Sequence, residues 1–476
     1  MTATPPRSGK PAARQARARP ASAGPTASAA HAIAHITPAR AAAFDILTLV
    51  GEGTAHSDQL LHSGKSISAL SLDDRNLTTA LVMGVLRWQI ALDARLAKLL
   101  ARPDQPLAAP VALALRIGAF QLLHMDRIPA HAALSESVEL CRAAGHPHAA
   151  GMVNAILRKL AVAQKSGARI FESTAAFSER LAHPLWLVDR WVAAYGREAA
   201  LAICEYDQRE PARGALFAGA NSDAAADAAV EAAPQMDDGS RLVAELAAAA
   251  LPRITGRAAR VWDCCAAPGG KTLLLAQRLE TAAILATDVS SKRLAQTAAR
   301  IRRYPHTQHV QCLVADAAAP ASAASPSPVD GPFDLILCDV PCTGTGTLAR
   351  NPEIRHRLRA EDLARQAERQ RAILNGALSR LAPGGRLVYS TCSLEPEENQ
   401  RVIDAIAPGL RRLPIGPLIA RLAELALLSP NVAAELTRSA VRDGALRTLP
   451  GTHACDGFYA AVLERPNPAT SQKVSA

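Results

Sequence analysis

Two cysteines in this sequence are placed for chemistry, because each follows a short apolar run of β-forming residues. Cys342 comes shortly after the run at 333–339, and Cys392 comes directly after the run at 386–391. A thiolate adds readily to an electron-poor ring carbon such as C6 of a pyrimidine. A second thiol nearby can remove the proton from C5, so that the first sulfur is released. The pair therefore predicts covalent chemistry on a pyrimidine, provided that the two runs are neighbouring strands.

Aspartates end four successive β-rich runs in the second half of the chain. They are Asp263, Asp288, Asp316 and Asp339. Ligands of an open α/β sheet bind beyond the carboxyl ends of the strands, so we expect these side chains around one crevice. A single aspartate at this position could simply cap the following helix. The prediction of a ligand site therefore depends on the whole series.

A turn of small residues follows the first of these runs. Its sequence is Cys265-Ala266-Ala267-Pro268-Gly269-Gly270-Lys271. Without bulky side chains, its backbone amides can approach a ligand just before the next helix begins. Asp288 comes about 20 residues later, where a carboxylate can accept hydrogen bonds from both ribose hydroxyls. The turn matches neither the Gly-x-Gly-x-x-Gly pattern nor a Walker loop, so we expect S-adenosylmethionine rather than NAD or ATP.

The elements that carry these residues alternate between strands and helices. The β-rich runs lie at 261–263, 284–288, 310–316, 333–339 and 386–391. A helical pattern runs from Leu363 to Leu381 between the last two and ends before Pro383-Gly384-Gly385. Such alternation predicts a parallel, doubly wound α/β sheet. The Ala-, Ser- and Pro-rich stretch at 317–332 is expected to be an inserted surface loop.

The first half of the chain shows helical periodicity instead. Apolar residues recur at spacings of three and four from Leu77 through Leu81 and Val85 to Leu99, and similar stripes extend from Pro38 to Leu160. We expect an all-α bundle at 38–165, a helical connector at 166–245 and the α/β domain at 246–466. Residues 1–37 have no acidic residue and are expected to form a disordered basic tail. A second disordered tail is expected at 467–476.

Composition limits the kind of protein and its partners. The 476 residues carry a net charge of +10, which favours a polyanion such as nucleic acid as a partner. No apolar run reaches the ~18 residues that a bilayer requires, and no signal peptide is evident, so we expect a soluble, cytoplasmic protein with no membrane partner. The nine cysteines show no disulfide framework and no zinc-site spacing, so reduced thiols and no metal are expected.

Several strings resemble the motifs of the RNA cytosine-5 methyltransferases. They are Asp263-Cys-Cys-Ala-Ala-Pro-Gly-Gly-Lys-Thr272, Asp339-Val-Pro-Cys342, Ser390-Thr-Cys-Ser-Leu-Glu-Pro-Glu-Glu-Asn399 and Asp456-Gly-Phe-Tyr459. In the first half, the segments at 115–129 and 151–158 resemble a NusB-like RNA-binding domain. Together they are similar to the family members that methylate 16S ribosomal RNA. The resemblance covers about residues 38–463 and implies a NusB-like bundle followed by a Rossmann-like methyltransferase domain.

The resemblance also implies a role for each motif residue. Cys392 would be the nucleophile that attacks C6, and Cys342 would help to remove the C5 proton. Asp339 would hydrogen-bond the N3 edge of the base. The residues implied around S-adenosylmethionine are Cys265, Ala266, Ala267, Pro268, Gly269, Gly270, Lys271, Asp288, Asp316 and Asp339. No metal is implied, and we expect a monomer.

Two features leave the substrate open. Family members carry a small RNA-binding subdomain and a Gln-Asp-Ala-Ser-like string before the catalytic domain. Here the interval is short and alanine-rich, and the string is Met236-Asp-Asp-Gly-Ser240. Transfer RNA or another RNA is therefore an alternative substrate. A non-catalytic RNA-binding or antitermination-type factor is the alternative from another class, and a DNA cytosine-5 methyltransferase would leave Cys392 without a role.

Overall fold

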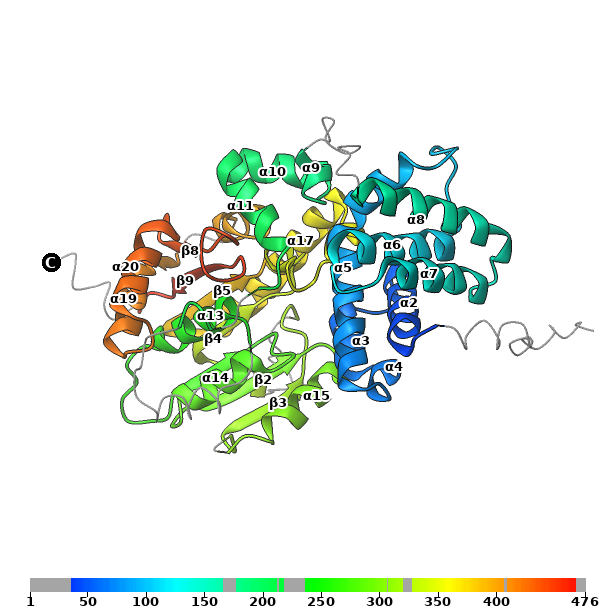
Figure 1. Cartoon of the computed structure of the whole chain (residues 1–476). Coiled ribbons are helices and arrows are strands. Elements are labelled where there is room, and N and C mark those ends of the chain that lie inside the picture. The colour runs from blue at the N-terminus through cyan, green and yellow to red at the C-terminus, as the bar shows by residue number, and fades with distance from the viewer. Residues whose placement is uncertain are drawn as a thin grey trace, which may run out of the picture.

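The computed structural model describes residues 36–165, 177–211, 214–217, 236–305, 307–319, 328–405 and 409–467. These residues form a body of helices from the first part of the chain and an α/β body from the second part, side by side (Figure 1). Most of the two expected tails lies outside the described residues, as do 218–235 and residues 320–327, half of the expected surface loop. No described helix is long and apolar enough to cross a membrane.

The first body is helical, as predicted. Its helices are α2 (Pro38–Gly51), α3 (Ser57–Ser63), α4 (Lys65–Ser68), α5 (Leu72–Ala97), α6 (Ala109–His124), α7 (Ala130–Ala143), the 3₁₀ helix η1 (Pro147–Ala149) and α8 (Ala150–Lys165). The predicted stripes supply its core, in which Leu81, Val85 and Leu157 are buried. Gly84 on α5 allows α6 to approach closely, because a Cβ there would lie 1.9 Å from the ring of Phe120.

Short helices connect the two bodies. They are α9 (Phe177–Arg180), α10 (Leu185–Tyr195) and α11 (Arg197–Asp207). Trp191 and Ile203 of this connector pack with Leu348 and Leu394 of the α/β body. The next helix, α13 (Asp238–Ala249), packs on the sheet and contains the predicted boundary at residue 245.

Five parallel strands form the centre of the sheet, as predicted. They are β1 (Arg260–Asp263), β2 (Ala283–Asp288), β3 (Val310–Val314), β4 (Phe333–Asp339) and β5 (Leu381–Thr391), in the order β3-β2-β1-β4-β5. The helices between them are α14 (Gly270–Arg278), α15 (Ser291–Ile301), α16 (Ile354–Arg357) and α17 (Ala360–Ser379), with the 3₁₀ helices η2 (Pro328–Asp330) and η3 (Thr345–Thr347). Because the strand order reverses between β1 and β4, a crevice opens at their carboxyl ends.

The expectation of a wholly parallel sheet was incomplete. In the described part of the chain, β6 (Arg411–Leu413), β7 (Val441–Arg442), β8 (Ala445–Arg447) and β9 (Tyr459–Glu464) extend the sheet in antiparallel pairings. β9 has a continuous apolar pattern that periodicity alone cannot distinguish from a buried helix. The predicted end of the helix at Leu381 was also wrong, because α17 ends at Ser379 and Leu381 begins β5.

Helices cover both faces of this sheet. One face packs against α13, α14, α19 (Gly416–Glu424) and α20 (Pro430–Ser439) through a core that includes Leu246, Leu335 and Val388. The other face packs against α17 and α18 (Gln400–Asp404) through a core that includes Trp262, Ile336 and Tyr389. The strand ends are therefore fixed by a buried core on each side, which makes the crevice a rigid site.

The segment after Cys342 ties the crevice to the helical body. The Glu353 carboxylate accepts hydrogen bonds from the backbone N–H (3.1 Å) and hydroxyl (2.9 Å) of Ser57. His356 Nε2 lies 2.7 Å from the carbonyl oxygen of Leu86. The buried guanidinium of Arg355 donates to backbone carbonyls, among them that of Arg87 at 3.2 Å. The helical body is thus held beside the turn that carries Cys342.

Candidate active site

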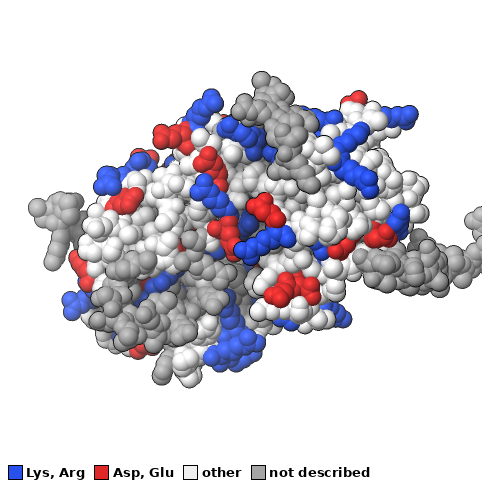
Figure 2. Space-filling view, viewed as in Figure 1, with Lys and Arg blue, Asp and Glu red and all other residues white. Residues whose placement is uncertain are grey.

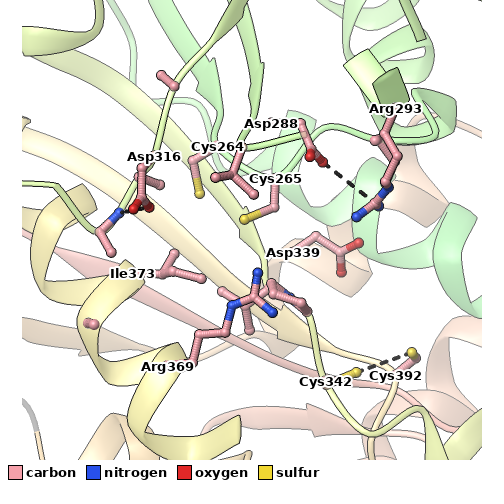
Figure 3. Close-up of a pocket in the computed structure, with 18 residues that line it drawn as sticks. Cys264, Cys265, Asp288, Arg293, Asp316, Asp339, Cys342, Arg369, Ile373 and Cys392 are labelled. Carbon is pink, nitrogen blue, oxygen red and sulfur yellow. Dashed lines mark hydrogen bonds and ion pairs between the residues drawn. The ribbon is translucent and has the colours of Figure 1, made fainter. Parts of the chain in front are cut away.

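A cavity of about 300 Å³ lies beyond the carboxyl ends of the central strands (Figure 3). Its lining includes the predicted residues Cys265, Ala267, Asp288, Asp316, Asp339, Cys342 and Cys392. Figure 3 shows Asp288, Asp316 and Asp339 around one hollow, with the two cysteines at its edge. We call this space the first cavity.

Asp288 ends β2 and turns its carboxylate toward the first cavity. Oδ1 accepts a hydrogen bond from the backbone N–H of Ser290 at 2.9 Å, which also shapes the start of α15. The Arg293 guanidinium lies 3.8 Å from Oδ2. The next side chain, Val289, is 56% exposed although it lines the cavity. A carboxylate beside an exposed apolar surface suits a ligand with hydroxyl groups next to a flat ring.

Asp316 comes two residues after the end of β3. Its Oδ1 accepts a hydrogen bond from the backbone N–H of Ala318 at 2.9 Å, which fixes the side chain at the rim of the first cavity. Arg369 and Ile373, both on α17, line the same cavity. The structure therefore brings together three of the four strand-end aspartates that the sequence placed around one crevice.

The fourth aspartate, Asp263, does not line the first cavity but contributes to the lining of the neighbouring cavity described below. It is 1% exposed and accepts a hydrogen bond from the Thr272 hydroxyl at 2.6 Å. Burial raises the pKa of Asp263 to about 7, although the bond from Thr272 acts in the opposite direction. Asp263 thus joins the end of β1 to the start of α14 and supports the turn between them.

The small-residue turn separates two cavities. Cys265 and Ala267 line the first cavity, whereas Ala266, Pro268, Gly270 and Lys271 face only a neighbouring one. Gly269 lies in neither lining. Its φ of +93° suits glycine, and a Cβ there would lie 2.8 Å from Cγ2 of Thr297.

The second cavity, of about 320 Å³, shares one wall with the first. The shared residues are Cys265, Ala267, Asp339, Val340 and Cys392. Its other lining residues include Met236, Asp237, Ser240, Arg300, Thr347, Asn351 and Phe458. A ligand in one cavity and a ligand in the other would therefore meet at Asp339 and Cys392.

Lys271 is held between Asp339 and the second cavity. Its Nζ lies 2.7 Å from Asp339 Oδ2 and donates to the Ser240 hydroxyl at 2.6 Å. The ammonium also lies 5.5 Å from the centre of the Phe458 ring, within cation–π range. Burial would lower the pKa of Lys271, but the charge and hydrogen bond of Asp339 outweigh it, so the pKa is raised. Lys271 therefore keeps a positive charge beside the shared wall.

The two cysteines meet as the sequence predicted. Cys342 Sγ and Cys392 Sγ are 3.3 Å apart, at the ends of the neighbouring parallel strands β4 and β5 (Figure 3). The hydrogen bond to Cys392 and burial raise the pKa of Cys342 well above its ordinary value. Cys342 is therefore a neutral thiol that can donate its proton to the Cys392 sulfur. The raised pKa makes Cys342 a weaker nucleophile at neutral pH.

Asp339 lies next to this pair at the end of β4. Its Oδ1 accepts a hydrogen bond from the Ser390 hydroxyl at 2.7 Å, and its Oδ2 pairs with Lys271. These two contacts fix the carboxylate in the wall that both cavities share. Asp339 can therefore contact a ligand on either side.

Five of the other cysteines fit a structural role. Cys264 Sγ donates to Cys338 Sγ at 3.2 Å beneath the small-residue turn, and Cys141, Cys204 and Cys455 are buried. All nine cysteines are free thiols. Among the described residues, no group of three or more His, Cys, Asp or Glu side chains is placed to hold a metal ion.

Sequence reasoning missed several side chains that line the two cavities. Arg369 belongs to a helix whose pattern predicted only its buried face, and Arg293 belongs to a segment for which no helical pattern was described. Asn351 and Phe458 reach the second cavity from distant parts of the chain. The Met236–Ser240 string was noticed only as a departure from a family motif, yet three of its residues line that cavity. Its position just before a helix was the one local signal available.

Comparison with known proteins identifies both parts of the chain. The model of the NusB family matches residues 37–162, and the model described as 16S rRNA methyltransferase RsmB/F matches residues 255–464. The ribosomal RNA small subunit methyltransferase B of Xanthomonas campestris pv. campestris is 32% identical over 419 residues, which cover 82% of this chain and 89% of the relative. The protein of the same name from Pseudomonas syringae pv. tomato is 33% identical over 412 residues, covering 79% and 88%.

A solved structure shares the fold over most of the chain. The crystal structure of PH0851 superposes with a TM-score of 0.65 and 20% identity, covering 90% of this chain and 99% of that chain. The fold and the matches define an RNA methyltransferase that combines a NusB domain with a Rossmann-like domain. More narrowly, the chain belongs to the RsmB/F family of 16S rRNA methyltransferases.

Proposed function

We propose that this protein transfers a methyl group from S-adenosylmethionine to C5 of a cytosine in 16S ribosomal RNA, through a transient bond between Cys392 and C6. One observation carries the proposal. Two cavities share a wall that contains Cys392 and Asp339, and the second thiol, Cys342, lies 3.3 Å from the first. This arrangement supplies a place for a methyl donor, a place for a base and two sulfurs where they meet.

The first cavity suits S-adenosylmethionine. The Asp288 carboxylate would accept hydrogen bonds from the ribose hydroxyls, while Val289 would offer an apolar surface for the adenine. Asp316, across the cavity, can accept from an exocyclic amine. When bound, S-adenosylmethionine supplies an electrophilic methyl group on a sulfonium. The wall formed by Cys265, Asp339 and Cys392 would hold that group near the base.

The first chemical step is addition of the Cys392 thiolate to C6. The new S–C6 bond moves the electrons of the C5=C6 bond onto C5 and the ring, which makes C5 a nucleophile. Asp339 is placed to hydrogen-bond the N3 edge, and the charge of Lys271 lies 2.7 Å behind it. The Lys271 ammonium stabilises the negative charge that develops on the ring during addition, whereas Asp339 would stabilise it through a proton shared with N3.

The release step depends on the proton that Cys342 carries before addition. Once Cys392 is bonded to C6, it no longer carries the charge that holds the proton on Cys342. After C5 has taken up the methyl group, Cys342 can lose its own proton to water and take the remaining proton from C5. The electron pair of the C5–H bond re-forms the C5=C6 bond and expels Cys392 as a thiolate. The contact with Cys392 thus keeps Cys342 protonated before addition. Once Cys392 is bonded to C6, Cys342 is free to act as a base.

Charge near the second cavity supports an RNA substrate. Lys292, Arg293 and Arg300 on α15 are followed by Arg302 and Arg303, and Arg300 lines the second cavity. Figure 2 shows Lys and Arg side chains gathered at the lower edge of this view, where α15 lies in Figure 1. RNA is expected to bind such a surface through its phosphates, with the target base unstacked. A monomeric state and a place in the cytoplasm stay predictions.

The proposal is tested by incubating the purified protein with S-adenosylmethionine and 16S rRNA transcribed in vitro. Nucleosides from the digested RNA are then identified by mass spectrometry, and the position is mapped by bisulfite sequencing. We expect 5-methylcytidine with the wild type and none with Cys392→Ala. Methylation of transfer RNA but not of 16S rRNA would assign transfer RNA as the substrate instead. Absence of 5-methylcytidine from every RNA tested would overturn the proposal.

A further inference from the structure

Glu398 is a buried carboxylate outside both cavities. It is 0% exposed, yet its two oxygens accept four hydrogen bonds. Oε1 accepts from the backbone N–H of Thr343 and from Gln370 Nε2, each at 2.9 Å. Oε2 accepts from the hydroxyls of Thr343 and Ser393. A buried charge with this many donors is fixed in one place.

Three of these four donors belong to the two turns that carry the catalytic thiols, and the fourth, Gln370, lies on α17. Thr343 directly follows Cys342, and Ser393 directly follows Cys392. The same oxygen of Glu398 thus joins the residue after one sulfur to the residue after the other. Tyr389 on β5 holds Glu398 in turn, because its hydroxyl donates to the Glu398 carbonyl oxygen at 2.6 Å. Glu398 is therefore the bridge between the two turns.

The two turns depend on this bridge to different degrees. Cys392 follows β5, whose last residue, Thr391, pairs with Tyr459 in the sheet, and the Cys392 carbonyl oxygen accepts from Gly346 N at 2.9 Å. Cys342 lies three residues beyond the end of β4. The next residue, Thr343, is bonded to Glu398 through both its backbone and its side chain. Loss of the carboxylate should therefore displace Cys342 more than Cys392.

The charge of Glu398 also acts on Cys342, in addition to the geometric bridge. Burial raises the pKa of Glu398, while the bonds from Ser393 and Thr343 oppose that shift. The charge of Glu398 is also one of the causes that raise the pKa of Cys342, after the hydrogen bond to Cys392, burial and the charge of Cys392. The carboxylate thus helps to keep Cys342 protonated until Cys392 has reacted.

We propose that Glu398 is a positioning residue that holds the Cys342 sulfur against Cys392 and thereby sets the rate at which methylated RNA is released. The inference rests on the proposed function and adds a residue to it. It assigns Glu398 to the release step, in which Cys342 removes the C5 proton, and not to addition by Cys392. A residue with a merely structural role would slow both steps in equal proportion.

The test is Glu398→Gln in the full chain, with a 16S rRNA transcript and S-adenosylmethionine. Glutamine keeps the size of the side chain but has only one acceptor oxygen, so it cannot accept all four bonds. Covalent protein–RNA adduct is measured on denaturing gels, and methyl transfer is measured in a single turnover. We expect the steady-state adduct to rise about tenfold, as expected for a lost charge-assisted bond, while single-turnover methylation falls by less than about threefold.

Glu395→Gln is the matched control. Glu395 lies in the same turn, is equally buried, and accepts from Arg190 at 2.7 Å and from Trp191 Nε1 at 3.1 Å. Its side chain is bonded to the connector and not to Thr343 or Ser393 in the described structure. We expect this variant to lose stability without accumulating adduct.

Thr343→Val supplies a second variant if Glu398→Gln does not fold. It removes one hydroxyl from Glu398 and keeps the shape of the side chain, so adduct should again accumulate, to a smaller extent. Equal losses of addition and release in these variants, or adduct levels like those of Glu395→Gln, would overturn the positioning role. If the wild type itself formed no 5-methylcytidine, the proposed function would have failed instead.

Discussion

Asp288→Ala should weaken the binding of S-adenosylmethionine strongly while leaving the fold intact. In the structure, Oδ1 already accepts from Ser290 N at 2.9 Å, and Oδ2 is directed into the first cavity with Arg293 at 3.8 Å. The carboxylate can therefore accept from two ribose hydroxyls, one at each oxygen. Each such charge-assisted bond contributes about 1.5–3 kcal/mol. Even the lower value for both bonds corresponds to a rise in Kd of about 150-fold.

The assay for this variant is isothermal titration calorimetry with S-adenosylhomocysteine, which binds without reacting and needs no RNA. Asp288→Asn is the matched control, because the amide oxygen still accepts from Ser290 N. Loss of the charge alone should raise Kd by about tenfold. Urea denaturation of each variant verifies that the fold is retained. A Kd for Asp288→Ala within threefold of the wild-type value would refute the assignment of the first cavity to the nucleoside.

Three further predictions concern the elements that support the site. Gly269→Ala should destabilise the protein by about 1–2 kcal/mol in urea denaturation, because of the positive φ and the contact with Thr297, and unchanged stability would contradict it. Burial raises the pKa of Asp207 to about 7, so its stabilising contribution is complete below about pH 4 and is lost as the pH rises through 7. Asp207→Asn should therefore become more stable relative to the wild type between pH 5 and pH 8, and a constant difference would disprove this. Glu353→Gln weakens the hydrogen bonds from Ser57 and should lower the free energy of unfolding by about 1–3 kcal/mol, measured as a lower urea midpoint.

The proximity of the two cysteines could be predicted because their signals are local. Cys342 and Cys392 each follow a recognisable strand, and neighbouring parallel strands end at the same edge of a sheet. The same reasoning placed Asp288, Asp316 and Asp339 around one cavity. Strand ends are therefore the part of such a site that a single sequence reveals best.

Features that depend on distant contacts could not be predicted. Asp263 follows the same local pattern as the other aspartates, but Thr272 and the surrounding core bury it. Glu398 lies in a recognised motif, yet its bond to Thr343 joins positions 55 residues apart. The second cavity likewise receives Phe458 from near the end of the chain. None of these contacts leaves a periodic pattern in the sequence.

The central claim is that the Cys392 sulfur bonds to RNA and that Cys342 breaks this bond. The most direct test compares Cys342→Ala, Cys392→Ala and the double variant with 16S rRNA and S-adenosylmethionine, followed by heating in detergent and electrophoresis. We expect Cys342→Ala alone to retain a covalent protein–RNA band, because it can add to the base but cannot release it. A band that persists in Cys392→Ala, or its absence from Cys342→Ala under conditions in which the wild type methylates RNA, would contradict the account.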